Sequence, residues 1–383
     1  MEQKNSPEIR CSGFTDEWQE YSMGELYTER KEPGNDSLPI LSVSIHTGIS
    51  DGELDEEGLG KTVRRNEDKS TYKHVYAGDL VFNMMRAWQG AIGSAPGEGM
   101  ISPAYICAKP NEKVYPLFID YYVKRKELIE QINSLSYGVT DFRKRLYWDS
   151  FVKVKCKLPS VEEQKWIADM IAVYDEVITA SEQEIANLET LKKAVMKKIF
   201  SQEVRFKRED GTGFPEWEEK MLGSYCNIVT GKLDANAMIE DGEYDFYTSG
   251  IAKYKIDVAA FEGPAITIAG NGATVGYMHL ADGKFNAYQR TYVLTKFKAL
   301  REYLFYAIGD RLPLKIMKEA RAGNIPYIVM DMLTELYVAL PCIEEQRLIA
   351  GFLSDFDEAI ISAKKELELW KELKKGLIQQ MFV

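Results

Sequence analysis

A 43-residue stretch that occurs twice constrains this chain more than any other feature. Residues 158–200 begin LPSVEEQKWIADMIAVYDEVI and residues 340–382 begin LPCIEEQRLIAGFLSDFDEAI, so a constant offset of 182 aligns them without a gap. Fifteen of the 43 aligned positions are identical. Two unrelated helices would share neither this register nor the LPxxEEQ start, so the chain contains a tandem duplication.

Each copy predicts one long helix, because apolar residues recur at alternating steps of three and four. At 1.5 Å per residue such a helix is roughly 60 Å long, and two matched helices most simply pair as an antiparallel coiled coil. Ser160 and Glu163 fit a capping box at the first start, and Cys342 replaces the serine at the second, which should be weaker. The predicted seam is Ile171, Tyr174, Ile178, Ile185, Leu188, Val195 and Ile199 in the first copy, and Leu353, Phe356, Ile360, Ala363, Leu367, Trp370, Leu377 and Met381 in the second.

The duplication extends to the segments that precede the helices. A GFxxEW signature at 13–18 and a GFPEW signature at 213–217 each have a glycine six residues after the tryptophan. Both segments mix short β-rich runs with one helical run, at 117–134 and 300–310. The predicted class is mixed α/β (α+β), with two globular domains separated by long helices in a pseudo-twofold tandem repeat. The predicted divisions are 1–157 and 203–339 for the domains, and 158–202 and 340–383 for the helices.

Composition narrows the class of protein. The chain has no apolar run near the roughly 18 residues of a membrane span, and its first residues lack a signal-peptide core, so we expect a cytoplasmic protein. Five cysteines without a CxxC pair argue against a disulfide framework and a zinc site. The formal net charge of −11 weighs against nucleic-acid binding, so that function would depend on local basic clusters.

Motifs for catalysis are missing. GLGKT (58–62) lacks the first glycine of a phosphate-binding loop. GNGATVG (270–276) has the wrong glycine spacing for a dinucleotide site and precedes a strand-like run, so it predicts a tight turn between strands. The three histidines stand alone, without ligand or triad spacing. We therefore expect no catalytic residue, no metal and no bound cofactor.

Loop residues that can contact DNA occur in both segments. Arginine and lysine donate hydrogen bonds to guanine, asparagine and glutamine form paired hydrogen bonds with adenine, and hydroxyl groups bind phosphates. A charged loop is more often only a solvated loop, so each cluster alone is a weak signal. Trp88 is expected in the core, whereas Arg86 and Gln89 beside it are the better candidates for DNA contact. The candidates are Arg64, Arg65, Lys69, Lys73, Arg86, Gln89, Arg143 and Lys144 in the first segment, and Thr248, Ser249, Lys253, Lys255, Asn271, Gln289 and Arg290 in the second.

The order of signature, variable domain and LPxxEEQ helix, repeated once, resembles the specificity subunit of type I restriction-modification systems over essentially the whole chain. YAGDLVFNMMRAWQGAIGSAP (76–96) and EGPAITIAGNGATVGYMHLADGKF (262–285) resemble two kinds of target-recognition domain in that family. The resemblance implies that each domain reads half of a split site in double-stranded DNA, and that the helices hold the two domains a fixed distance apart. Departures from the family pattern are Cys342 and the net acidity.

The same resemblance implies partners. Two methyltransferase subunits and the restriction (translocase-nuclease) subunits would perform the chemistry, and S-adenosylmethionine, ATP and magnesium would belong to them. The expected partner-binding residues are Glu162, Glu163, Gln164, Glu344, Glu345 and Gln346. Two alternatives remain. The first is a coiled-coil scaffold whose domains bind proteins; salt-dependent duplex binding by the assembled complex would distinguish a specificity subunit from it. The second is a stand-alone nuclease or methyltransferase, against which the missing catalytic motifs argue.

Overall fold

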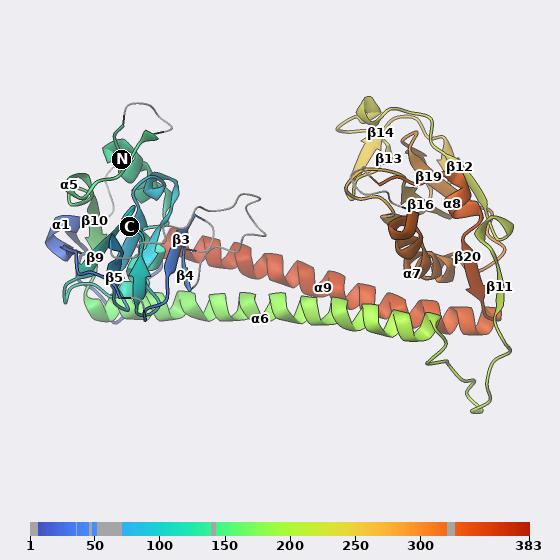
Figure 1. The fold of residues 1–383 in the computed structure, drawn as a ribbon, viewed down its shortest axis with the longest axis horizontal. Coiled ribbons are helices and arrows are strands. Elements are labelled where there is room, and N and C mark those ends of the chain that lie inside the picture. The colour runs from blue at the N-terminus through green and yellow to red at the C-terminus, as the bar shows by residue number, and fades with distance from the viewer. Residues whose placement is uncertain (1–6, 36, 46–47, 52–70, 139–142, 320–325) are drawn as a thin grey trace. The chain divides into compact units, whose positions relative to one another are not determined.

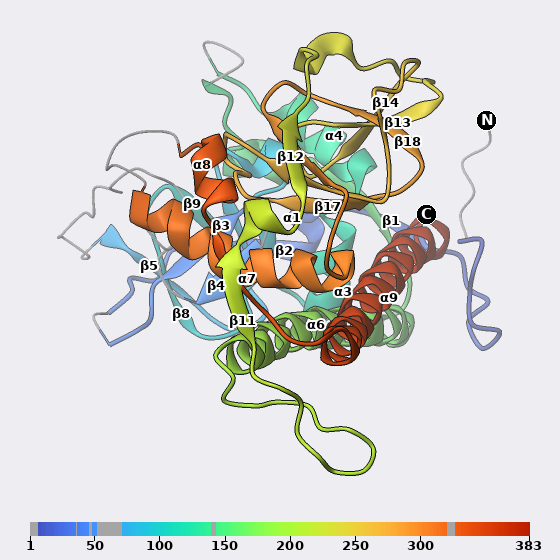
Figure 2. The same ribbon diagram turned by 90° about the vertical axis from the view of Figure 1, so that its right-hand side faces the viewer.

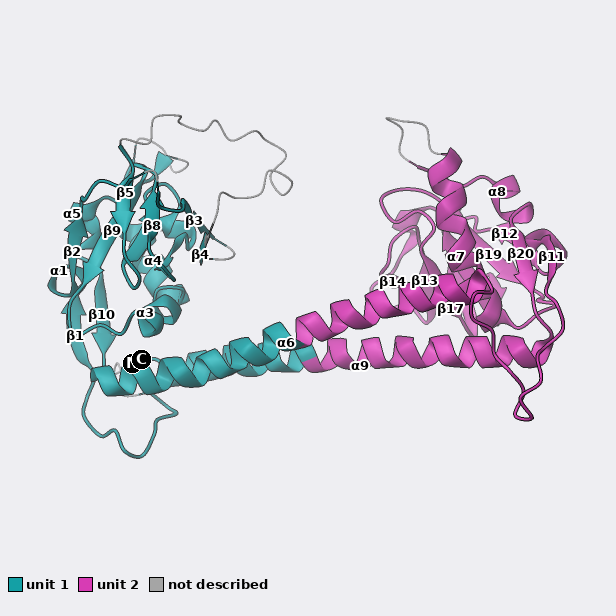
Figure 3. Ribbon diagram, turned by 60° about the horizontal axis from the view of Figure 1, so that its bottom comes forward, with its two compact units in different colours: residues 1–180, 367–383 teal, residues 181–366 magenta. Residues whose placement is uncertain are grey.

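The computed structural model describes residues 7–35, 37–45, 48–51, 71–138, 143–319 and 326–383. By compactness the chain divides into unit 1, residues 1–180 with 367–383, and unit 2, residues 181–366 (Figure 3). Each unit therefore contains one globular part together with a portion of both long helices.

Many of the elements are labelled in Figure 1. The globular part of unit 1 contains β1 (Gln19–Ser22), α1 (Met23–Leu26), β2 (Tyr27–Arg30), β3 (Leu41–Ser44), β4 (Gly48–Asp51), β5 (Lys73–Val75), β6 (Leu80–Asn83), η2 (Ala87–Gln89), β7 (Ile92–Ser94), β8 (Gly99–Ile101), β9 (Tyr105–Pro110), α3 (Pro116–Tyr122), α4 (Lys126–Leu135), α5 (Trp148–Phe151) and β10 (Lys155–Leu158). That of unit 2 contains β11 (Glu218–Met221), η4 (Leu222–Ser224), β12 (Asn227–Thr230), η5 (Ala235–Ala237), β13 (Tyr244–Tyr247), β14 (Lys253–Ile256), β15 (Phe261–Glu262), β16 (Ala265–Ala269), β17 (Met278–Ala281), β18 (Lys284–Ala287), β19 (Thr291–Thr295), α7 (Arg301–Glu319), α8 (Met330–Thr334) and β20 (Tyr337–Leu340).

The repeated stretch forms two long helices, α6 (Val161–Phe200) and α9 (Ile343–Met381). Every predicted seam residue is buried or half-buried, whereas Val173 and Ile361, off the seam, are more than half exposed. Within unit 2 the ion pairs Lys192–Asp357 and Glu189–Lys364 run in opposite chain directions, so the helices are antiparallel there. The predicted antiparallel pairing is confirmed.

Both units combine helices with sheets, which confirms the predicted mixed class. In unit 1 the four-stranded sheet has the order β2-β9-β6-β7, and α3 contacts β7. In unit 2 two four-stranded sheets have the orders β12-β19-β16-β17 and β14-β13-β18-β15, and α7 contacts β16 and β17. Figure 2 labels β13, β14 and β18 of the second sheet. The helical run expected at 117–134 is two helices, because the backbone of Arg125 is extended (φ −69°, ψ 145°).

A two-stranded antiparallel sheet joins the beginning and end of each globular part. β1 directly follows Trp18 and pairs with β10, with Gln19 opposite Leu158. β11 directly follows Trp217 and pairs with β20, with Glu218 opposite Leu340. The GFxxEW or GFPEW signature is therefore bonded to the strand that leads into the LPxxEEQ helix.

The C-terminal end of one long helix completes the core of each unit. In unit 1 the ring of Phe382, next to the end of α9, lies 5.1 Å from that of Phe118, and in unit 2 Phe200 of α6 lies 5.9 Å from Tyr303. Both phenylalanines are buried, and burying such a side chain stabilises the fold by about 1.5–3 kcal/mol. Across the described part of the chain, no helix combines the length and apolar character needed to cross a membrane.

Candidate nucleic-acid interface

One edge of unit 2 is built from loops that backbone hydrogen bonds tie together. Tyr288 N donates to Tyr247 O at 2.9 Å, and Gln289 N donates to Leu233 O at 2.8 Å. Gly270 N donates to Arg290 O at 2.9 Å, and Ile328 N donates to Gly270 O at 2.7 Å. These bonds gather the loops 231–234, 248–252, 270–277, 288–290 and 326–328, which we call the loop edge.

Glycines allow these loops to approach closely. A Cβ atom on Gly231 would lie 2.0 Å from Ala287 O, and one on Gly270 would lie 2.3 Å from Arg290 O. Gly272 and Gly276 have positive φ values of 86° and 84° in the turn between β16 and β17, where L side chains are strained. The GNGATVG stretch is thus a tight turn between strands, as predicted, and part of a compact surface.

The loop edge brings together five of the predicted DNA contacts: Thr248, Ser249, Asn271, Gln289 and Arg290. Ser249 Oγ donates to Asn271 Oδ1 at 2.6 Å, and Gln289 Nε2 donates to Asp234 Oδ1 at 2.8 Å. Arg290 is exposed and has no side-chain partner among the described residues. Two oriented amides and an unpaired guanidinium offer the donors and acceptors that base edges require.

The two predicted lysines of β14 differ in their surroundings. Lys255 Nζ pairs with Asp245 Oδ1 at 2.9 Å, which neutralises part of its charge, whereas Lys253 Nζ lies 5.5 Å from the centre of the Tyr247 ring.

Burial, followed by the charge of Lys253, lowers the pKa of His279 below its ordinary value. His279 is therefore held neutral beneath the loop edge, and its Nε2 has no partner within the described residues.

Exposed tyrosines beside the loop edge were missed by the sequence reasoning. Tyr277 is 40% exposed and Tyr327 is 60% exposed, and the backbone of Tyr327 bridges to that of Asn271. Exposed aromatic rings can stack on nucleotides or contact the sugar. Tyr277 directly follows the GNGATVG turn, which was an available signal, but Tyr327 is far from Asn271 in sequence and carried none.

In unit 1 two predicted contacts lie on the turn between β6 and β7. Arg86 and Gln89 are both exposed, while Trp88 packs against the core, as expected. Leu146 N donates to Met84 O at 2.9 Å and so places the segment that carries the predicted contacts Arg143 and Lys144 beside this turn.

The four remaining predicted DNA contacts of the first segment are not placed on this turn by the described structure. Lys73 is half-buried: its Nζ donates to Tyr105 O at 2.8 Å, and burial lowers its pKa. Lys73 is thus bonded within the fold, and its contact with DNA stays a prediction. Arg64, Arg65 and Lys69 lie outside the described residues, as does GLGKT.

The LPxxEEQ motifs anchor the helix starts inside each unit. The Glu163 carboxylate accepts two bonds from Arg10, both 2.7 Å long, and one from Trp18 Nε1 at 3.4 Å. In unit 2 the Glu345 carboxylate likewise accepts from Arg205, at 2.9 and 3.2 Å, and from Trp217 Nε1 at 2.9 Å. Both glutamates are almost fully buried. The second glutamate of each LPxxEEQ motif thus accepts a hydrogen bond from the tryptophan of the signature in the same unit.

The glutamine of each motif is also internal. Gln164 Oε1 accepts from Tyr115 N at 2.9 Å, and its Nε2 donates to Pro159 O at 3.0 Å. Gln346 bonds Leu300 N and Pro341 O in the same way, at 2.9 and 2.8 Å. Glu163, Gln164, Glu345 and Gln346 are thus buried and already bonded within their own units, whereas Glu162 and Glu344 are exposed. The partner-binding role of the six residues stays a prediction.

The capping box at Ser160 forms only in half. Ser160 Oγ accepts from Glu163 N at 3.3 Å, but the Glu163 carboxylate is taken by Arg10 and Trp18. The second helix start is anchored by the same kind of buried ion pair, so Cys342 removes only the hydroxyl contact.

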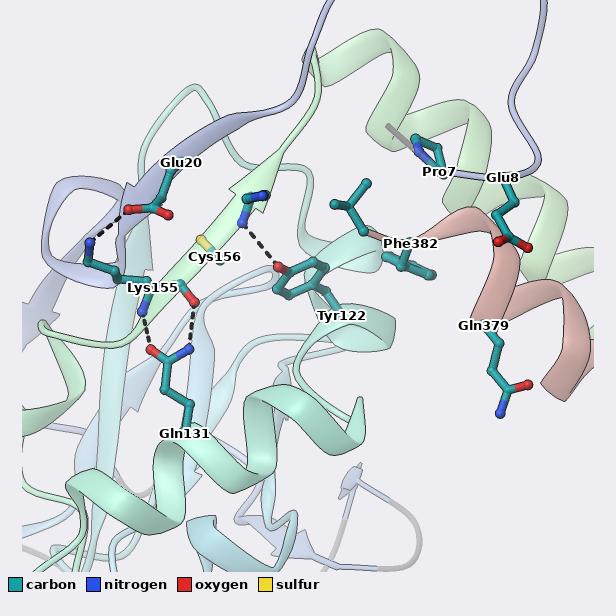
Figure 4. Close-up of a pocket in the computed structure, with 11 residues that line it drawn as sticks. Pro7, Glu8, Glu20, Tyr122, Gln131, Lys155, Cys156, Gln379 and Phe382 are labelled. Atoms are coloured by element: carbon teal, nitrogen blue, oxygen red, sulfur yellow. Dashed lines mark hydrogen bonds and ion pairs between the residues drawn. The ribbon is translucent and has the colours of Figure 1, made fainter. Parts of the chain in front are cut away.

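A cavity of about 570 Å³ lies in unit 1 beside the end of α9 (Figure 4). Its central polar groups are paired with one another: Lys155 Nζ with Glu20 at 2.7 Å, and Tyr122 Oη, as acceptor, with Lys157 N at 3.0 Å. The described residues contain no cluster of three or more His, Cys, Asp or Glu side chains that could hold a metal ion. Residues at and just after the end of α9 line part of this cavity, and the loop edge remains the candidate interface.

Comparison with known proteins agrees with this geometry. Residues 215–369 match the type I restriction modification DNA specificity domain. The type I restriction enzyme EcoDI specificity subunit of Escherichia coli is 38% identical over 164 residues, which cover 43% of this chain and 36% of that subunit. The type I restriction enzyme MjaVIII specificity subunit of Methanocaldococcus jannaschii is 25% identical over 331 residues, which cover 75% of each chain.

The fold has a solved counterpart. The crystal structure of the type I restriction-modification S subunit from M. genitalium superposes with a TM-score of 0.64 over 99% of each chain, at 16% sequence identity. The resemblance to type I restriction-modification specificity subunits is therefore confirmed, since residues 215–369 match the DNA specificity domain of that family and the chain has the fold of a specificity subunit.

Proposed function

We propose that this chain is the DNA-recognition subunit of a type I restriction-modification complex. Its two globular parts, residues 7–157 and 203–339, would act as recognition domains that each read one half of a bipartite duplex site. The observation that carries the proposal is the loop edge of unit 2: its polar residues lie within the 215–369 match to a DNA specificity domain.

The chain itself would be non-catalytic and would act in the cytoplasm. Methyltransferase and restriction subunits would supply the chemistry, and S-adenosylmethionine, ATP and magnesium would bind to those partners. The similar proteins are named as subunits of restriction enzymes, which supports assembly into a larger complex.

The long helices offer surface for these partners. Leu191 on α6 and Leu373 on α9, which are equivalent under the 182-residue offset, are 51% and 55% exposed. Glu162 and Glu344, also equivalent, are exposed at the helix starts. A repeated exposed surface would suit two copies of the methyltransferase subunit.

Methylome sequencing tests the proposal in a host that produces this chain with its methyltransferase subunit. We expect one bipartite methylated motif for the unaltered chain. The double variant Gln289→Ala/Arg290→Ala should relax the bases of one half only, since a good bidentate contact discriminates by about 1–3 kcal/mol. The matched double variant Arg86→Ala/Gln89→Ala should relax the other half.

Two outcomes contradict the proposal. If the folded complex of the unaltered chain gave no bipartite motif and showed no salt-dependent binding to duplex DNA, the chain would be better described as a coiled-coil scaffold for proteins. If each folded double variant lost both halves equally, the assignment of one half-site to each domain would be wrong.

A further inference from the structure

A three-residue contact of the same geometry occurs in both units. In unit 1, Tyr121 Oη donates to Asp175 Oδ2 at 2.7 Å, and Lys374 Nζ donates to Asp175 Oδ1. In unit 2, Tyr306 Oη donates to Asp357 Oδ2 at 2.7 Å, and Lys192 Nζ donates to Asp357 Oδ1 at 2.5 Å. We call these the Tyr–Asp–Lys triads.

Each triad joins three different elements. The tyrosine comes from a helix of the globular part, α3 or α7, the aspartate from one long helix and the lysine from the other. The lysine also lies over the tyrosine ring, with Nζ at 5.3 Å from its centre in unit 1 and 5.1 Å in unit 2. Each oxygen of one carboxylate therefore holds a separate element, and the lysine–ring contact closes the triangle.

The triads explain identities within the repeat that seam packing does not require. Asp175 and Asp357 are equivalent under the 182-residue offset, and so are Lys192 and Lys374. The roles of α6 and α9 are exchanged between the units: α6 supplies the aspartate in unit 1 and the lysine in unit 2. The two tyrosines are 185 residues apart and belong to helices that share little other sequence.

The surroundings keep the tyrosines as hydrogen-bond donors. Burial and the hydrogen bond to aspartate raise the pKa of both Tyr121 and Tyr306 well above the ordinary value, so both phenols stay protonated. A phenol ring is rigid and has few rotatable bonds, so the bond fixes the distance from the globular part to the long helix. Removal of the hydroxyl alone should leave the packing of the ring in place.

We propose that the two Tyr–Asp–Lys triads are positioning groups that fix the orientation of each recognition domain on its helix pair and thereby restrict the spacer length at which its half-site is read. The proposal rests on the function proposed above. A domain that can tilt on its helices can reach its half-site over a wider range of spacers, although its loops still read the same bases.

Tyr121→Phe and Tyr306→Phe, each assembled with the methyltransferase subunit, test this proposal. The measurement is the methylation rate on the normal site divided by the rate on sites whose spacer is one base pair longer or shorter. We expect this ratio to fall about two- to tenfold, the range that corresponds to one ordinary hydrogen bond, with an unchanged preference for the half-site bases. Lys374→Arg and Lys192→Arg keep the ion pair and should preserve the ratio, whereas Lys374→Met and Lys192→Met should lower it.

Matched controls are available in both units. Tyr115→Phe removes a hydroxyl whose hydrogen bond to Asp169 Oδ1 of α6 is long, at 3.5 Å, and therefore weak. Tyr225→Phe removes a buried hydroxyl that has no partner in the described part of the structure. Neither control should change the spacer ratio. If the triad variants left the ratio unchanged, or slowed methylation equally at every spacer, the positioning role would be refuted.

A second measurement does not depend on DNA. Hydrogen–deuterium exchange of the full chain should show faster exchange of α3 in Tyr121→Phe and of α7 in Tyr306→Phe, but not in the control variants. If the unaltered complex methylated no bipartite site, the proposed function would fail, and the exchange rates alone would decide whether the triads hold these helices. Unchanged exchange in both triad variants would overturn the triads as positioning groups.

Discussion

Individual buried charges attach the repeated motifs to their units. Glu345 has a fully buried side chain that binds Arg205 and Trp217, whereas its neighbour Glu344 is 63% exposed and lies 3.4 Å from Arg208. The same motif therefore places one structural and one surface glutamate side by side. A comparison of the two positions separates burial from charge.

Glu345→Gln should destabilise the protein far more than Glu344→Gln. Loss of the buried carboxylate leaves Arg205 without its counter-ion, and we expect about 3 kcal/mol, the low end for a broken buried pair, because Arg205 retains some exposure. The exposed pair should contribute less than about 1 kcal/mol. Urea unfolding of both variants measures the difference, and equal losses would contradict the assignment of Glu345 as an anchor.

His279 should make the stability of unit 2 sensitive to pH. Its folded pKa is lowered, chiefly by burial, so the unfolded chain binds more protons once the pH falls below its ordinary pKa of about 6.5. The contribution to stability is complete above that pH and is lost as the pH falls toward the folded pKa. His279→Gln should flatten the decrease in the free energy of unfolding over this range, and an unchanged pH profile would show that His279 is not responsible.

At the scale of elements, the loop edge depends on close packing between strands that are distant in sequence. Gly231 follows β12 and touches the end of β18, and Gly270 follows β16 and touches the loop before β19. The placement of these loops therefore rests on backbone contacts that only glycine permits.

Gly231→Ala should displace the loop edge, because its Cβ would lie 2.0 Å from a backbone oxygen. Overpacking of this kind costs about 1–3 kcal/mol, and the half-site read by unit 2 should be lost while the other half is retained. Methylome sequencing and thermal unfolding measure the two effects. Gly213→Ala is the control, since no atom lies within 4 Å of its Cβ position, and similar effects of both variants would refute the packing argument.

At the scale of the whole molecule, the net charge of −11 opposes binding to a polyanion. This net charge already includes the lysines and arginines of the candidate interface. Partner subunits would therefore have to supply much of the phosphate contact.

The isolated chain should bind duplex DNA weakly, in the roughly 10⁻⁴–10⁻⁶ M range of non-specific binding at physiological salt. The assembled complex should bind its site far more tightly and with a steep dependence on salt concentration, because phosphate contacts release counter-ions. Fluorescence anisotropy at several salt concentrations measures both. Nanomolar, sequence-specific binding by the isolated chain would contradict this prediction.

The repeat determined much of the architecture in advance. The shared register of 158–200 and 340–382 predicted two long helices and their seam, because an apolar stripe at heptad spacing must be buried against a partner. The turn at GNGATVG and the mixed class also followed from local patterns. In these cases the residues that decide the structure are close together in sequence, or are related by one constant offset.

Tertiary structure alone decided which side chains meet. It buried Glu163 and Glu345, which had been predicted to bind partner subunits, against the signature tryptophans, and it placed Lys73 Nζ within hydrogen-bond distance of Tyr105 O. It also gathered Asn271, Gln289 and Tyr327 at one edge, and paired Tyr306 with Asp357. The repeat period identifies equivalent positions in the two copies. Hydrogen bonds between elements, however, depend on how sheets and helices pack, and a single sequence does not show which residues that packing brings together.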